Sequence, residues 1–217
     1  MEKLLASIEP FKHLPADERK LIAKQAREMS YAKDETVFQA GAPADAVWVV
    51  KTGRIHLTTF LAGGKASTTC VMSVGDPFCC LPALDRKPYP VNAVAAEESV
   101  IIRIPIAAFH DAMSRSKEFA QQTLCLFCDR LRQVEHRSCM IYEAVDVRLA
   151  QVLLTLSKKF GSIIPLTRQE LAELAGTTHE TTIRTLSRFK EQGLITSARG
   201  NTTILRPEGL QALIEPR

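Results

Sequence analysis

Residues suited to reading DNA bases are concentrated between positions 179 and 188. If this stretch is a helix, with about 100° per residue, one arc carries five polar side chains: Glu180, Thr181, Arg184, Ser187 and Arg188. Glutamate accepts a hydrogen bond from cytosine N4, and arginine donates two to guanine O6 and N7. The opposite arc, which we expect to be buried, consists of Thr182, Ile183, Leu186 and Phe189. The pattern predicts a DNA-reading helix; the alternative is a solvated helix in which Glu180 pairs with Arg184.

The residues before this helix have the features of a helix-turn-helix. Thr167 is a suitable N-cap for a first helix, and Glu170 would complete a capping box three residues later. The apolar face of that helix is expected at Leu171, Leu174 and Ala175. Gly176 can adopt the positive φ of a tight turn, and Thr178 can cap the second helix. Together these signals predict a DNA-binding helix-turn-helix.

A β-hairpin is expected directly after the second helix. Residues 194–196 and 202–205 are rich in β-formers, and the turn Arg199-Gly200-Asn201 separates them. Such a hairpin is the wing of a winged helix, with Arg199 at its tip placed to meet a phosphate. We therefore expect DNA contacts from eleven residues: Arg168, Gln169, Thr178, His179, Glu180, Thr181, Arg184, Ser187, Arg188, Arg199 and Asn201.

The charge distribution agrees with this prediction. The 217 residues carry a formal net charge of +4. From Val147 onward there are ten Lys and Arg against six Asp and Glu, so the whole excess lies with the predicted DNA reader. We expect no transmembrane helix, because no run of about 18 apolar residues exists. Residues 1–14 lack a signal peptide's apolar core, so we expect a cytoplasmic protein with reduced cysteines.

The first half of the chain is built from short β-like runs. Between residues 28 and 107 these runs alternate with glycines, without a long helical period: 35–38, 46–50, 55–60, 68–72 and 99–104. Evenly spaced strands of this kind predict a β-barrel, sandwich or roll. The sequence offers no nucleophile elbow, phosphate-binding glycine loop or zinc-protease histidine pair, so we expect no enzyme.

A long helix is expected between the two parts, over about residues 116–144. Apolar residues alternate at steps of three and four, with Ser138 as a polar interruption: Leu124, Phe127, Leu131, Val134, Ile141 and Val145. Either the roll or a second copy of the chain covers this seam, and we favour a homodimer. The predicted domains are 1–115, with an N-terminal helix and β-roll; 116–145, the dimerisation helix; and 146–217, the winged helix. The fold class is α+β.

This order of elements resembles the Crp/Fnr family of bacterial transcription regulators. The most specific similarity lies in Thr167-Arg168-Gln169-Glu170-Leu171-Ala172 and Glu180-Thr181-Thr182-Ile183-Arg184; residues 34–41 and 49–53 are also similar to the family's roll. The resemblance implies a cupin-like jelly roll, a pseudo-palindromic operator, and RNA polymerase as a partner. It implies that Glu180 and Arg184 read a C·G/G·C step and that Arg168 contacts the DNA backbone. His179 stands where the cyclic-AMP receptor has an arginine.

The resemblance also implies an effector pocket, whose cassette here is residues 75–84. In cyclic-AMP-binding members a glutamate holds the ribose, and a following Arg-Ser pair with backbone amides holds the phosphate. In this chain Cys79 replaces a glycine, Cys80 the glutamate and Pro82 the next glycine, while Pro90-Val91 lies where Arg-Ser is expected. We therefore expect that cyclic AMP is not the effector. The first cysteine is Cys70, which excludes the N-terminal iron–sulfur cluster of the oxygen-sensing branch.

The sequence leaves several alternatives for the effector. The expected effector pocket contains Cys79, Cys80, Arg86, Cys125, Cys128, Arg132 and His136. Four of its thiols could bind a metal or act as redox sensors: Cys79, Cys80, Cys125 and Cys128. Non-covalent haem is a second possibility, with ligands among the cysteines and His56, His110 and His136. The third is a small organic acid held by Arg86, Lys87 or Arg132. The alternatives to a sensor are cysteines that only fill the core, as in a constitutive DNA-binding protein, and a thiol redox enzyme.

Overall fold

The computed structural model describes residues 1–60, 66–198 and 200–215. Its internal contacts divide the chain into two units, Met1–Gln133 and Val134–Arg217, and the boundary falls within one long helix. The units are therefore described separately. Along the described residues, no helix is both long enough and apolar enough to span a membrane.

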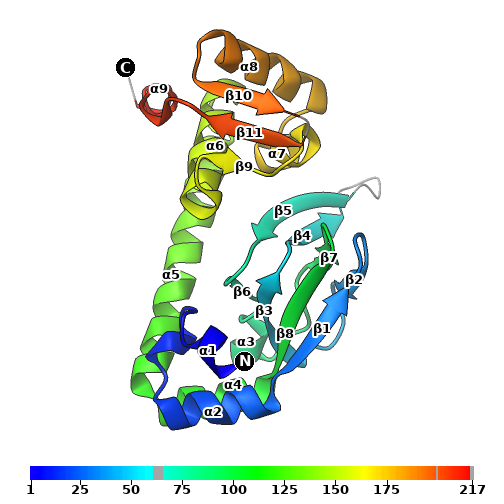
Figure 1. Cartoon of the computed structure of the whole chain (residues 1–217), viewed down its shortest axis with the longest axis vertical. Coiled ribbons are helices and arrows are strands. Elements are labelled where there is room, and N and C mark those ends of the chain that lie inside the picture. The colour runs from blue at the N-terminus through cyan, green and yellow to red at the C-terminus, as the bar shows by residue number, and fades with distance from the viewer. Residues whose placement is uncertain (61–65, 199, 216–217) are drawn as a thin grey trace. The chain divides into compact units, whose positions relative to one another are not determined.

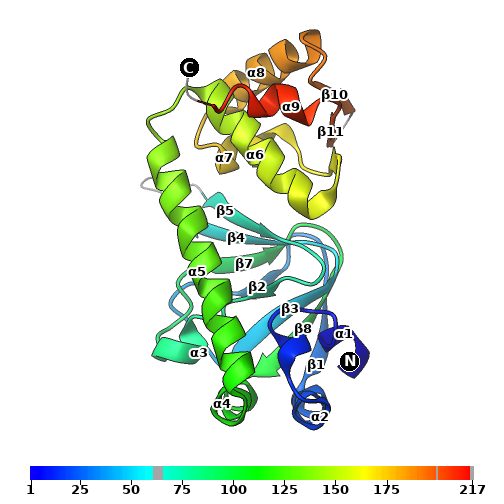
Figure 2. The ribbon, with the colours of Figure 1, turned by 90° about the vertical axis from the view of Figure 1, so that its left-hand side faces the viewer.

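The N-terminal unit contains two four-stranded antiparallel sheets (Figures 1 and 2). One sheet has the order β1 (Arg27–Tyr31), β8 (Ser99–Pro105), β3 (Ala46–Thr52) and β6 (Pro77–Phe78). The other has the order β2 (Thr36–Phe38), β7 (Asn92–Ala95), β4 (Ile55–Phe60) and β5 (Ala66–Met72). The predicted β-roll is thus confirmed, and each expected strand is present within two residues of its predicted bounds.

The apolar strands β3 and β8 are buried on both faces. Trp48 and Val50 point into the core shared by the two sheets, whereas Val47 and Val49 contact a second core formed with the helices. Ile101 and Ile102 on β8 divide in the same way. Because successive side chains of a strand point to opposite faces, a strand covered on both sides is mostly apolar, which explains the unbroken run at 46–50 and the three isoleucines of β8, Ile101, Ile102 and Ile104.

In the described part of this unit, six helical segments accompany the sheets. They are α1 (Glu2–Leu5), the 3₁₀ turn η1 (Phe11–His13), α2 (Ala16–Gln25), α3 (Pro82–Asp85), α4 (Ile106–Arg115) and α5 (Lys117–Met140). Phe119 of α5 has its ring centroid 5.5 Å from Phe11 and 5.3 Å from Phe109. All three rings are fully buried, so they join the N-terminal segment, α4 and the start of α5 into one core.

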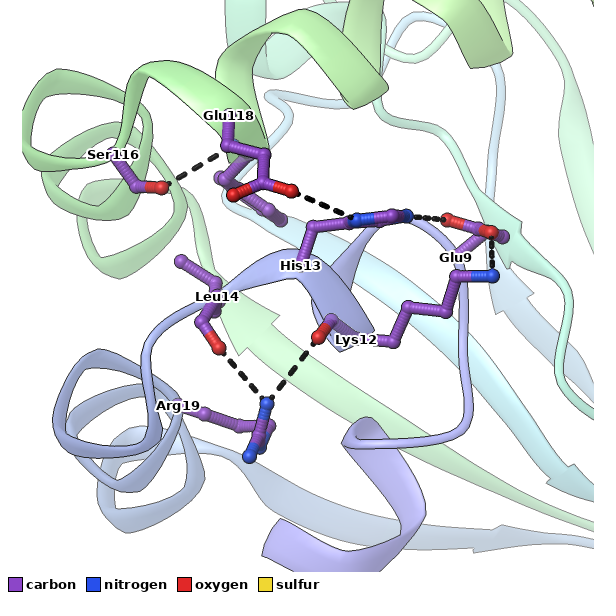
Figure 3. A network of polar contacts seen from close by, with 8 residues as sticks. Glu9, Lys12, His13, Leu14, Arg19, Ser116 and Glu118 are labelled. Carbon is purple, nitrogen blue, oxygen red and sulfur yellow. Dashed lines mark hydrogen bonds and ion pairs between the residues drawn. The ribbon is translucent and has the colours of Figure 1, made fainter.

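A polar network reinforces this junction at the surface (Figure 3). His13 lies between two carboxylates: its Nε2 is 3.1 Å from Glu9 Oε2, and its Nδ1 is 3.4 Å from Glu118 Oε1. Arg19 donates to the carbonyl of Leu14 at 2.9 Å. Ser116 Oγ accepts from the backbone N–H of Phe119 at 3.2 Å and so caps the first turn of α5.

The C-terminal unit holds four helices and a three-stranded sheet after the end of α5 (Figure 1). Its elements in chain order are α6 (Val145–Phe160), β9 (Ile163–Ile164), α7 (Arg168–Leu174), α8 (His179–Glu191), β10 (Ile195–Ala198), β11 (Asn201–Ile204) and α9 (Pro207–Gln211). The sheet order is β10-β11-β9. This arrangement confirms the predicted winged helix-turn-helix. Strand β9 was not predicted, since two residues leave almost no pattern in the sequence.

Two predictions about the long helix and the hairpin are wrong in detail. A single helix through Val145 was expected, but α5 ends at Met140, Ile141 lies in a turn, and Val145 begins α6. Packing explains this break, because Leu149, Leu153 and Leu156 of α6 are buried in the C-terminal unit. The backbone at Ala144, just before α6, is extended, with ψ 152°. The hairpin turn is one residue shorter than predicted, since Asn201 already pairs with Ala198 in the sheet.

Candidate DNA interface and cassette region

The helix-turn-helix is held by the local contacts that its sequence predicts. Thr167 Oγ1 accepts from the Glu170 N–H at 3.2 Å, while Glu170 Oε2 accepts from the Thr167 N–H at 2.5 Å, a complete capping box. Thr178 Oγ1 caps α8 by accepting from the Thr181 N–H at 3.2 Å. Gly176 has φ +60°, as the turn requires. These contacts fix where α7 begins, where the turn lies and where α8 begins.

An arginine from α6 supports the same turn. Arg148 Nη1 donates to the carbonyls of Ala175 and Gly176, each at 2.8 Å. Carbonyls at a helix end lack partners within the helix, so the guanidinium satisfies groups that the turn leaves open. A Cβ on Gly176 would lie 3.3 Å from Arg148 Nη1, which adds a steric reason for glycine there.

Helix α8 has one buried and one exposed face. Thr182, Leu186 and Phe189 are buried and Ile183 is half-buried, which confirms the predicted inner arc. The predicted contact residues of this helix that are exposed are His179, Glu180, Arg184, Ser187 and Arg188, with Thr181 half-buried beside them. Arg184 Nη2 donates a hydrogen bond to Thr181 Oγ1 at 3.5 Å. Within the described part of the chain no ion pair joins Arg184 to Glu180, so both side chains present their polar atoms to solvent.

Two clefts flank this exposed face inside the C-terminal unit. The first, about 500 Å³, lies between the start of α7, the start of α8 and the β10–β11 hairpin. It brings together four of the predicted contact residues: Arg168, Gln169, His179 and Asn201. Arg199, predicted at the hairpin tip, lies outside the described residues. The first cleft thus has a cationic side chain on the side of α7 and polar side chains on the hairpin.

The second cleft, about 480 Å³, lies between the start of α6 and α8. It is lined by Thr181, Arg184 and Arg188 from α8 and by Asp146 from α6. Asp146 Oδ2 is 3.4 Å from Arg188 Nη2. Asp146 lies in the first turn of α6. Nothing in the local sequence indicates its approach to Arg188, 42 residues later.

In the N-terminal unit, the two cassette cysteines are buried. Cys79 has φ +55°, a left-handed conformation that favours glycine, and it occupies the position where the family resemblance implies glycine. Burial raises the pKa of the Cys79 thiol to about 12, with a further contribution from Cys80 and an opposing one from the Arg130 charge. Burial likewise raises the pKa of Cys80 to about 11 against the effect of Arg130. Both thiols are therefore protonated at neutral pH.

The predicted effector pocket is not assembled. Helix α5 turns Phe119, Thr123 and Phe127 toward the core of its unit, and Arg130, on the same stripe, donates to the carbonyl of Pro77. The cysteine-bearing face is the other one: Cys125, Cys128 and Cys139 are exposed. The expectation that this face meets the cassette is wrong: the helix turns one stripe inward, and the large rings of Phe119 and Phe127 bury more apolar area there than thiols would.

The remaining pocket candidates are also separated. Arg86 is exposed, and Arg132 is exposed and pairs with Asp129 at 2.8 Å. The side chain of His136 lies outside the described residues. His56 is on β4, whereas His110 is on α4 beside the other sheet. Among the residues described, no three His, Cys, Asp or Glu side chains gather as they would around a metal ion. Metal binding by the four thiols stays a prediction.

Aromatic side chains fill the core between the two sheets. Phe38 stacks on Tyr89 with centroids 3.9 Å apart and lies 5.9 Å from Trp48 and 6.2 Å from Phe78. The Tyr89 hydroxyl accepts from Trp48 Nε1 at 3.0 Å. The cassette beside this core carries Cys80 in place of a ribose-binding carboxylate. These donors and acceptors do not match the set that the family resemblance implies for cyclic AMP.

Comparisons with known proteins agree with this architecture. Residues 28–116 match the cyclic nucleotide-binding domain family, and residues 147–213 match the Crp-like helix-turn-helix domain. The chain is 24% identical over 204 residues to the CRP-like cAMP-activated global transcriptional regulator of Mycobacterium tuberculosis, covering 90% of this chain and 91% of that protein. It is 25% identical over 201 residues to the transcriptional activator protein FnrA of Stutzerimonas stutzeri, covering 88% and 81%.

A solved structure shows the same fold. FixK2 from Bradyrhizobium japonicum superposes with a TM-score of 0.80 at 22% identity, covering 88% of this chain and 98% of that one. The two matched domains follow one another in the order seen here, with the roll before the helix-turn-helix. Three observations agree: the fold, the pair of matched domains and the exposed polar face of α8. This chain belongs to the Crp/Fnr family of DNA-binding transcription regulators.

Proposed function

We propose that this chain acts as a cytoplasmic homodimer that reads a pseudo-palindromic operator and responds to a signal other than cyclic AMP. The observation that carries the first part is the exposed face of α8, where Glu180 and Arg184 lie between two clefts that also hold Arg168 and Arg188. A carboxylate and a guanidinium one helical turn apart suit adjacent C and G bases. The flanking arginines suit phosphates on either side.

The roles of the contact residues follow from their positions. Glu180 and Arg184 read base edges, with Arg184 oriented by the Thr181 hydroxyl. Arg168, Gln169 and Asn201 contact the backbone through the first cleft. Thr178 and Ser187 border the reading face, and His179 replaces the arginine that the cyclic-AMP receptor has at this place. Arg199 is proposed as a phosphate contact from the hairpin.

Dimer formation is supported by apolar side chains on α5 that the chain itself leaves uncovered. Leu124, Leu131 and Val134 are each more than half exposed, as is Ile141 after the helix. Large aliphatic side chains in an exposed stripe favour burial against a second helix. Phe127 is less available than predicted, since it packs against its own core, and Val145 is half-buried. Paired readers would contact successive major grooves about 34 Å apart, next to a bound RNA polymerase.

The proposed signal is thiol chemistry on α5. Cys125, Cys128 and Cys139 are exposed, whereas Cys79 and Cys80 are buried and protonated, and it is exposed thiols that reagents reach first. Because Cys125 and Cys128 share the helix with Leu124 and Leu131, a modification there would change the surface that we propose for dimerisation.

The test of the DNA-reading function is binding selection from a pool of random duplexes. We expect enrichment of a two-fold symmetric site whose half-sites are separated by about one helical turn, with a C·G/G·C step in each half. A pool that remains random after repeated selection would exclude a sequence-specific regulator. A site without symmetry would contradict the dimer but not the reader.

The test of the signal begins with the visible absorption spectrum of protein purified without oxygen. We expect a colourless protein, followed by faster thiol-reagent labelling of the α5 cysteines than of the cassette. A sharp Soret band would assign haem, and broad charge-transfer shoulders would assign thiolate-bound iron; either result would overturn the thiol proposal.

A further inference from the structure

The ion pair between Asp146 and Arg188 places a carboxylate within the proposed DNA-reading surface. Asp146 lies in the first turn of α6, and its Oδ2 atom is 3.4 Å from Nη2 of Arg188, near the end of α8. Both residues line the cleft that also contains Arg184 and Thr181. Asp146 is the one acid among the residues that line this cleft. The cleft therefore presents two arginines, one of which has its charge compensated within the protein.

The ion pair is exposed and weak. The side chain of Asp146 is 31% exposed and that of Arg188 is 53% exposed. Solvent-exposed ion pairs contribute little, at most about 1 kcal/mol, because water screens them and two flexible side chains must be held together. Breaking the pair is therefore cheap, and removing its carboxylate would leave Arg188 free for another anion.

The backbone fixes the position of the carboxylate independently of Arg188. Asp146 Oδ1 accepts from the N–H of Val147 at 3.0 Å, so the side chain is folded over the first turn of α6. An acidic group in the first turn is also favoured by the helix dipole. Asp146 is thus positioned by α6, and the flexible Arg188 side chain comes to it.

We propose that Asp146 is a positioning residue that restrains sequence-independent DNA binding by holding Arg188 away from the phosphates. The inference rests on the proposed function, since it requires α8 to approach DNA. Each arginine that engages a phosphate releases condensed counterions and so strengthens binding to any sequence. With Arg188 paired to Asp146, the protein makes one such contact fewer on arbitrary DNA. Recognition of the operator bases through Arg184 is left in place.

The test is the substitution Asp146→Asn in the full-length chain. Asparagine keeps an Oδ1 acceptor for the Val147 N–H, so α6 retains its first turn, which a thermal melt verifies. Binding to a short duplex of arbitrary sequence is measured at several salt concentrations. We expect affinity at low salt to rise by up to about five-fold, which is the equivalent of about 1 kcal/mol. The slope of log K against log salt should steepen by about 0.9, the value for one added phosphate contact.

Two matched variants separate this mechanism from a general change in net charge. Glu191→Gln removes one negative charge from the exposed end of the same helix α8 and should leave the salt slope unchanged. Arg188→Ala removes the arginine that Asp146 is proposed to restrain. In that background Asp146→Asn should have no larger effect than Glu191→Gln.

Three results would overturn the inference. An unchanged slope in Asp146→Asn, with wild-type binding intact, would refute it while leaving the proposed function standing. Weaker binding in Asp146→Asn would show that the carboxylate orients Arg188 toward DNA instead of away from it. A wild-type protein that binds no duplex even at low salt would overturn the proposed function and the inference together.

Discussion

In the C-terminal unit the α8 side chains proposed to contact DNA stay exposed, whereas in the N-terminal unit the two cassette cysteines are buried. The exposed ones are fixed by caps and a turn that lie within a few residues of them. The buried ones are fixed by contacts across the fold, such as that from Arg130 to the carbonyl of Pro77. The reading surface is therefore a local product of the chain, and the cassette region is a product of long-range packing.

This difference shows that the reading face and the cassette depend on different kinds of contact. A helix face can retain Glu180 and Arg184 as long as the buried arc of α8 is kept. In the roll, Cys79 lies in a core between the sheets that the protein's own aromatic side chains fill. The contacts that fix the reading face are therefore separate from those that fix the cassette.

The largest expected effect comes from removing long-range packing in the N-terminal unit. Phe119→Ala should lower the free energy of unfolding of that unit by about 3–5 kcal/mol, because a fully buried ring in contact with Phe11 and Phe109 is lost. Denaturant unfolding followed by the fluorescence of Trp48, the one tryptophan of the chain, measures it. The matched control is Phe60→Ala, at a ring that is 66% exposed, for which we expect a change within about 0.5 kcal/mol. Equal losses in the two variants would contradict the packing described here.

The next effect concerns the reading face. Arg184→Ala should weaken binding to the selected operator by about 1–3 kcal/mol and relax the preference at one guanine. The measurement is a comparison of affinities for the operator and for its single-base variants. Arg168→Ala is the control, and it should lower affinity for all sequences alike because it contacts the backbone. An unchanged base preference in Arg184→Ala would remove the role assigned to that residue.

A smaller effect is expected from the local contacts of the reader. Thr167→Ala removes one half of the capping box and should destabilise the C-terminal unit by about 1 kcal/mol. Amide hydrogen exchange in α7 measures the change. Thr167→Ser keeps the hydroxyl and should restore protection, whereas equal exchange in both variants would show that the cap contributes nothing.

The smallest effect at neutral pH is expected from the cassette thiols. Their pKa values of about 12 and about 11 exceed the ordinary value of 9.0, so the native state holds its protons where the unfolded state releases them. The free energy of unfolding contributed by these thiols is therefore constant below about pH 9 and decreases as pH rises above it. Unfolding of Cys80→Ala should show a shallower decrease between pH 9 and 11 than the wild type does. Identical pH profiles would mean that the thiols ionise freely in the fold.

Much of the architecture could be predicted because it depends on nearby residues. Thr167, Gly176 and Thr178 mark the ends of α7 and α8, and alternating apolar runs mark the strands of the roll. The predictions that failed concern relations across the chain: the break at residues 141–144 and the face of α5 that packs inward. Arg130 and Asp146 were missed for the same reason, since their partners lie 53 and 42 residues away.

The sequence by itself determined the helix-turn-helix, its capping residues, the β-roll and the polar face of α8. Each of these follows from hydrogen bonds within one turn or from a side-chain period of 3.6 or 2 residues. Only the tertiary structure decided which face of α5 is buried, where that helix ends, and that Asp146 meets Arg188. In each case several apolar or charged side chains could make the same contact. Which of them makes it depends on the packing of the whole unit.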